Sequence, residues 1–167
     1  MTTEQVALHE KRRVHEFTQL NHGTPARVFP LLCPVREAEW LPRWKYRMVY
    51  SRSGIAEPGC VFTTPNDDGP ETTWLITRHD PVNFEIAFAW VRPQLLATQL
   101  EICLSSAGHD RATSRIRYTY TALSPEGERE LAGMGSEWFE RRLRAWETAI
   151  NYYLDQGEII SGPEWGS

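Results

Sequence analysis

The stretch "SPEGERELAGMGSEWFERRLRAWETAINYYLDQG" (residues 124–157) has the pattern of a long amphipathic helix near the end of the chain. Ser124 can cap a helix that has Pro125 at its first position, and Gly157 can end it. The pattern predicts one continuous helix of about eight turns. Its large apolar residues share one broad face: Leu131, Trp138, Phe139, Leu143, Trp146, Ile150, Tyr153 and Leu154. A face this wide must be covered by another layer of structure.

Arg142 is the exception on that face, because helical periodicity places it about 40° from Trp138, near the middle of the apolar surface. An unpaired buried charge is costly. Its stem could pack while the guanidinium reaches solvent, or it could form a structural ion pair with Glu16 or Glu39. The functional alternative is an anchor for an anionic or carbonyl group of a ligand.

Upstream of residue 124, short segments of alternating character predict an antiparallel sheet. The alternation is clearest in "FEIAFAWV", where one face carries aromatic residues and an isoleucine. The predicted strands span residues 13–21, 44–51, 60–64, 72–79, 84–91, 98–106 and 113–123. Tight turns join them, including "PNDDGPE" at residues 65–71.

Between the first two strands, "TPARVFPLLCPVREAEW" (residues 24–40) predicts two short helices. Thr24 and Pro25 are suited to begin the first helix. Pro30 strains that helix and Pro34 ends it, so "VREAEW" forms a second one that stops before Pro42.

This order of elements resembles the helix-grip fold of the START, Bet v 1 and polyketide-cyclase superfamily, called SRPBCC. The carrying stretches are "TPARVFPLLCPVREAEWLPRW", "YSRSGIAEPGCVFTTP", "ETTWLITRHDP" and "WFERRLRAWETAINYYL", most similar to the polyketide cyclase and Hsp90-ATPase-activator-homologue branch. The resemblance implies a single α+β domain over residues 13–157, with polar tails at 1–12 and 158–167. A curved antiparallel sheet of about seven strands would wrap the long helix and leave a cavity, with the short helices at its mouth.

The expected ligand-binding residues follow from that cavity. Of Glu37 and Glu39, which point in opposite directions on a helix, Glu39 is expected to face the mouth. Glu16 shares a strand face with apolar residues, which suggests an inward direction; it could be a partner of Arg142, a polar residue at a strand end, or a general base with a raised pKa. Aromatic side chains would form core or pocket wall: Trp40, Trp44, Tyr46, Phe62, Trp74, Phe88, Trp90, Tyr118, Tyr120, Trp138 and Trp146.

Composition excludes several functional classes. The 167-residue chain has a net charge of −4, which argues against a nucleic-acid partner. No window approaches the roughly 20 apolar residues of a membrane span. Three widely spaced cysteines favour a reducing, cytoplasmic setting. The histidine spacing fits no metal site, and the absence of P-loop and Rossmann motifs predicts no cofactor.

Three functions remain. The leading hypothesis is binding of a small hydrophobic or amphipathic molecule in the cavity. The second is a cyclase- or dehydratase-type enzyme that uses a cavity carboxylate or tyrosine, favoured by a deep carboxylate without an arginine partner. The third is an Hsp90-activator-like interaction domain, favoured by a cavity filled with side chains and an exposed apolar patch. A homodimer built on an edge strand or on the tryptophan-rich mouth is left open.

Overall fold

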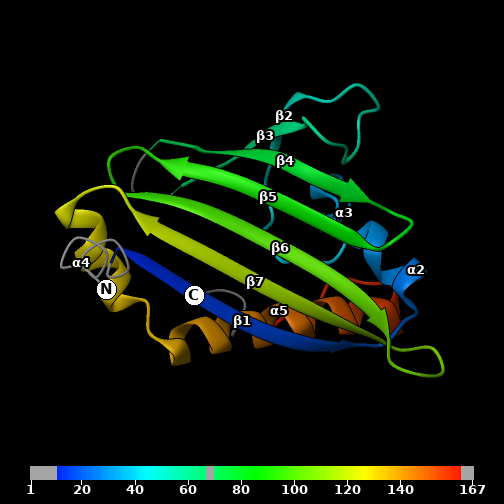
Figure 1. Cartoon of the computed structure of the whole chain (residues 1–167). Coiled ribbons are helices and arrows are strands. Elements are labelled where there is room, and N and C mark those ends of the chain that lie inside the picture. Colours follow the sequence, from blue (N-terminus) through cyan, green and yellow to red (C-terminus); the bar gives the residue numbers. More distant parts are fainter. Residues whose placement is uncertain (1–10, 67–69, 163–167) are drawn as a thin grey trace.

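The computed structural model describes residues 11–66 and 70–162, and shows a curved antiparallel sheet of seven strands around a C-terminal helix (Figure 1). The strand order is β1-β7-β6-β5-β4-β3-β2. The strands are β1 (Arg12–Asn21), β2 (Arg47–Tyr50), β3 (Val61–Thr64), β4 (Thr72–Asp80), β5 (Glu85–Arg92), β6 (Leu96–Ser106) and β7 (Ala112–Ala122). The predicted α+β helix-grip fold is confirmed. Most of the predicted polar tails (residues 1–10 and 163–167) and the centre of the turn at 65–71 lie outside the described residues.

The inner face of the sheet is organised in rows that cross the strands. Phe88 of β5 lies opposite Leu100 of β6, and Leu100 lies opposite Tyr118 of β7. Because side chains alternate along each strand, the next inward row lies two residues away. That row contains Trp90, Thr98 and Tyr120 in the same strand order, so the two rows lie side by side.

Two short helices follow β1, as predicted. The first is α2 (Pro25–Val28), which continues as the 3-10 helix η1 (Phe29–Leu32). Pro30 lies in η1, where its missing N–H removes an α-helical hydrogen bond and the tighter helix takes over. The second is α3 (Pro34–Glu37). It is a single turn and ends three residues before the predicted end at Trp40.

The long C-terminal helix is interrupted, so the prediction of one continuous helix was wrong. It consists of α4 (Pro125–Gly133) and α5 (Ser136–Gln156). Gly133 and Gly135 flank the break, and each glycine disfavours a helix interior by about 1 kcal/mol relative to alanine. The predicted ends are confirmed: the Ser124 hydroxyl accepts a hydrogen bond from the Gly127 N–H, and α5 stops at Gly157, which has a φ of 74°.

Helix α5 is fastened to β1 by polar side chains. The Gln19 amide donates to the carbonyl of Leu143 at 2.9 Å, and the Asn151 amide donates to the carbonyl of Leu20 at 2.8 Å. The Leu20 N–H donates to the Glu147 carboxylate at 2.7 Å. These bonds hold α5 along the β1 edge of the sheet (Figure 1). Within the described ranges, no helix is long and apolar enough to cross a membrane.

Candidate functional site

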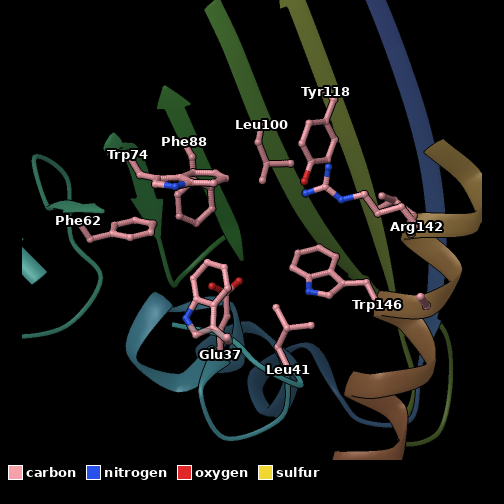
Figure 2. Close-up of a pocket in the computed structure, with 12 residues that line it drawn as sticks. Glu37, Leu41, Phe62, Trp74, Phe88, Leu100, Tyr118, Arg142 and Trp146 are labelled. Carbon is pink, nitrogen blue, oxygen red and sulfur yellow. The ribbon is translucent and has the colours of Figure 1, made fainter. Parts of the chain in front are cut away.

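A cavity of about 260 Å³ lies between α5, α3 and the inner face of the sheet (Figure 2). Its lining comes from α5, from α3 and the segment that follows α3, and from strands β3 to β7: Glu37, Leu41, Trp44, Phe62, Trp74, Phe88, Leu100, Tyr118, Arg142, Leu143, Ala145 and Trp146. We call it the aromatic cavity. An apolar wall with a few polar groups is typical of sites for small molecules.

Stacked and edge-on aromatic rings make up the sheet side of this wall. Trp74 stacks on Phe62 with ring centroids 5.6 Å apart, and meets Phe88 edge-on at 6.2 Å. These contacts settle the inward direction of Trp74, which the sequence left open. The Trp44 indole donates to the carbonyl of Pro34 at 2.8 Å, so its polar end is satisfied while its ring lines the cavity.

Glu37 is the buried carboxylate of the aromatic cavity. It is 7% exposed and rises from α3 toward the cavity centre (Figure 2). Burial raises the pKa of Glu37 to about 8, with no opposing contribution from a neighbouring charge or hydrogen bond. The carboxyl group is therefore largely protonated at neutral pH, where it can donate a hydrogen bond or, once ionised, accept a proton.

Glu39, which was predicted to face the mouth, lies on the opposite side of this segment. It accepts two hydrogen bonds from Arg36, at 2.6 and 3.0 Å, and one from the Tyr153 hydroxyl at 2.7 Å. The hydrogen bond from Arg36 is the main reason that the pKa of Glu39 is lowered. A helical signal was available, because Glu37 is four residues from buried Cys33 on one side and from Leu41 on the other.

Arg142 enters the aromatic cavity from α5, opposite Glu37 (Figure 2). Its guanidinium carbon lies 5.6 Å from the ring centroid of Trp138, in cation–π range. Neither proposed carboxylate partner pairs with it, since Glu39 binds Arg36 and Glu16 binds Arg117. Burial raises the pKa of Tyr118, and the positive charge of Arg142 opposes that rise.

Glu16 points to solvent, so its predicted inward direction was wrong. Its carboxylate lies 3.4 Å from the Arg117 guanidinium, and both side chains are about half exposed. The buried residues of β1 are His15, Gln19 and Asn21, with partly buried Phe17 between them on the same face. The apolar residues that share a face with Glu16, Val14 and Leu20, are themselves exposed, and they misled the assignment.

Trp40 and Tyr46 also lie outside the cavity lining. Trp40 is fully buried behind the wall, where its indole donates to the carbonyl of Leu31 at 2.8 Å and its ring packs 5.5 Å from that of Trp146. Tyr46 packs at the margin of the core. Four further lining residues were not predicted from the sequence: Leu41, Leu100, Leu143 and Ala145.

A second cavity, of about 460 Å³, adjoins the first. The remaining predicted residues, Trp90, Tyr120 and Trp138, line this cavity. It is lined by Thr64, Asn66, Thr72, Trp74, Trp90, Arg92, Leu96, Thr98, Tyr120, Met134, Trp138 and Arg142. We call it the polar cavity, because threonines, arginines and an asparagine replace most of the apolar wall. Trp74 and Arg142 belong to both cavities. In the part of the chain that the structure describes, no three histidine, cysteine or carboxylate side chains are grouped to hold a metal ion.

Comparison with family models and with curated proteins finds no match for this sequence. Solved structures do match. Norcoclaurine synthase from Thalictrum flavum, in complex with dopamine and hydroxybenzaldehyde, is 12% identical, with a TM-score of 0.65 over 95% of this chain and 96% of that chain. The Zhui aromatase/cyclase from Streptomyces sp. R1128 is 16% identical, with a TM-score of 0.63 over 87% and 94%.

Ara h 8.0201 is a further structural neighbour, 12% identical, with a TM-score of 0.57 over 86% of this chain and 97% of that chain. Identities this low establish the fold, while activity has to be argued from the site. The chain therefore has the helix-grip fold of these Bet v 1-like structures, the fold that its sequence resemblance implied.

Proposed function

We propose that this protein binds a small, flat and largely apolar molecule in the aromatic cavity. The observation that carries the proposal is the hollow itself, walled by Phe62, Trp74, Phe88 and Trp146 and left unfilled by side chains. Its volume of about 260 Å³ is near the small end of ligand sites, which favours a ligand of one to a few rings. Norcoclaurine synthase, with its small aromatic ligands, is a precedent within the fold.

Filling the hollow tests this function directly. N-phenyl-1-naphthylamine, a neutral fluorescent probe, is expected to bind the wild-type protein with enhanced emission. Leu100 is buried and lines the cavity, so Leu100→Trp is expected to weaken probe binding at least tenfold, about 1.4 kcal/mol. The matched control is Glu101→Trp, on the neighbouring exposed position of β6. Equal binding by the two folded variants would show that the probe sits elsewhere and would contradict the proposal.

A second candidate function is acid–base catalysis, which the position of Glu37 favours. This carboxylate is buried in the cavity, without an arginine bound to it, and its pKa of about 8 is suited to proton transfer near neutral pH. Arg142, on the opposite side of the same cavity, could stabilise a developing oxyanion. This assigns Glu37 the role that sequence analysis gave to Glu16 or Glu39.

The Kemp elimination of 5-nitrobenzisoxazole offers a test that requires no knowledge of the natural substrate. The base takes the proton from the ring carbon, the electron pair forms the nitrile, and the N–O bond breaks to release a coloured phenolate. We expect a rate that rises with pH around the Glu37 pKa of about 8, and a loss of about 100-fold in Glu37→Gln. Glu39→Gln, a surface control, is expected to keep the activity. Equal rates in both variants would rule out Glu37 as the base.

The interaction-domain alternative receives no support from the site. It would be favoured by an interior filled with side chains, whereas the aromatic cavity is hollow. The homodimer, built on an edge strand or on the tryptophan-rich mouth, remains a prediction.

A further inference from the structure

The polar cavity continues the aromatic cavity along the same three strands. Phe88, Leu100 and Tyr118 line the aromatic cavity, and the residues two positions away on β5, β6 and β7 line the polar one. Those residues are Trp90, Thr98 and Tyr120. Two residues span about 7 Å along a strand, so the two cavities are neighbouring compartments within reach of one small molecule.

The two compartments differ in chemistry. Thr64 and Thr98, both buried, and Thr72 bring hydroxyl groups to the polar cavity. Among the described residues that line it there is no carboxylate, while two arginines are present. The aromatic cavity differs in that its wall contains a carboxyl group, that of Glu37. The arginines of the polar cavity attract an anionic group of a ligand, and Glu37 repels that anionic group when the Glu37 carboxyl is ionised, above a pH of about 8.

Arg142 lies at the boundary and is the available cation. Arg92, the other arginine of the polar cavity, is engaged by Glu130 of α4. Arg142 is exposed, as expected for a stem that packs while the guanidinium reaches solvent; its guanidinium carbon lies 5.6 Å from the Trp138 ring centroid, and it lines both compartments. A guanidinium presents donors in a planar fork that suits a carboxylate.

We infer that the ligand is an amphipathic carboxylic acid that occupies both compartments. Its ring system lies in the aromatic cavity, its carboxylate binds Arg142, and its polar chain contacts Thr98 in the polar cavity. The inference rests on the proposed function, because it assumes that the aromatic cavity receives the rings, and it adds the chemical class of the ligand and a second binding compartment.

The test is competition for N-phenyl-1-naphthylamine by three probes: N-(2-naphthylacetyl)glycine, its methyl ester, and 2-methylnaphthalene. The acid is expected to bind the wild-type protein at least about tenfold more tightly than the ester, in line with a charge-assisted hydrogen bond. Arg142→Met is expected to remove this preference, and the control Arg141→Met, at the neighbouring exposed position, is expected to keep it. Thr98→Val is expected to weaken binding of the acid severalfold and to leave 2-methylnaphthalene unchanged.

The outcomes separate the two proposals. If 2-methylnaphthalene fails to compete with the fluorescent probe, the aromatic cavity is not a binding site and the proposed function fails. If it competes while the acid and the ester bind equally, the proposed function stands and the inference of an acidic ligand is overturned. A preference for the acid that survives Arg142→Met, or an affinity for the acid that is unaffected by Thr98→Val, also overturns the inference.

Discussion

Glu37→Gln is expected to stabilise the protein by about 3 kcal/mol at pH 7. The pKa of this carboxyl group rises from 4.5 to about 8 on folding, and each unit between the unfolded pKa and the working pH corresponds to about 1.36 kcal/mol. Glutamine keeps the shape and the neutral state of the protonated side chain. When the wild-type protein folds at pH 7, Glu37 must either bind a proton or be buried as a charge, and both cost folding free energy. Glutamine avoids this cost.

The sign of the pH dependence follows from the raised pKa. The contribution of Glu37 to stability is fully present below pH 4.5 and is lost as the pH rises through the folded pKa of about 8. The advantage of Glu37→Gln should accordingly be small near pH 4, grow through neutral pH and level off above pH 8. Chemical denaturation of both proteins at several pH values measures it. A difference independent of pH would mean that the carboxyl group titrates normally in the folded state.

The Glu39→Gln variant is the matched control, and its effect should have the opposite direction. The hydrogen bond from Arg36 lowers the pKa of Glu39, so ionised Glu39 stabilises the fold, and this contribution is lost as the pH falls. Glu39 is partly exposed, which keeps its contribution small. Opposite responses of two carboxylates two residues apart would locate the effect in the cavity.

The stability lost at Glu37 is itself an argument for function. A glutamine, a leucine or a methionine at this position would cost less folding free energy at neutral pH, because none of them ionises. Groups kept in an unfavourable protonation state concentrate at sites that bind or react. The ligand proposed for Arg142 and the proton transfer proposed for Glu37 both use the aromatic cavity, and the Kemp elimination and the acid–ester comparison address them separately.

The fold could be predicted from the sequence because its signals are local and repeated. Seven alternating segments and an apolar helix face left few arrangements with a buried core, and the resemblance selected the helix-grip fold among them. The break between α4 and α5 was missed because two glycines at Gly133 and Gly135 are individually tolerated in a helix. Their combined effect depends on packing that periodicity does not report.

The site was less predictable because it depends on which way single residues point. Glu16 was assigned inward from its neighbours Val14 and Leu20, yet exposed apolar residues are common on a sheet surface. Helical spacing relates Glu37 to Cys33 and Leu41, but the sequence does not say which face of α3 packs against the core, and Glu39 was chosen instead. The resemblance implied a cavity between sheet and helix, but its division into an aromatic and a polar compartment depends on the three-dimensional placement of single side chains.

Trp40→Ala is expected to produce the largest loss of stability among the changes considered, about 3–5 kcal/mol. Trp40 is 0% exposed, so its removal leaves a void behind the cavity wall and frees the carbonyl of Leu31 from its hydrogen bond. Trp40→Phe retains most of the volume but loses the N–H donor, and should lose about 1–3 kcal/mol. Trp138→Ala serves as the comparison, because Trp138 is 40% exposed and should lose clearly less stability than Trp40→Ala.

The Trp40 variants also test whether a residue packed behind the cavity lining affects ligand binding. Trp40 does not line the aromatic cavity, but its ring packs 5.5 Å from that of Trp146, which does. In Trp40→Phe, a protein that remains folded, Trp146 gains freedom to turn into the space behind it. Affinity for N-phenyl-1-naphthylamine should fall severalfold although the substituted residue touches no ligand. Unchanged affinity would show that Trp146 is held by α5 alone. If Trp138→Ala lost as much stability as Trp40→Ala, the buried layer behind the wall would contribute no more to stability than an exposed ring.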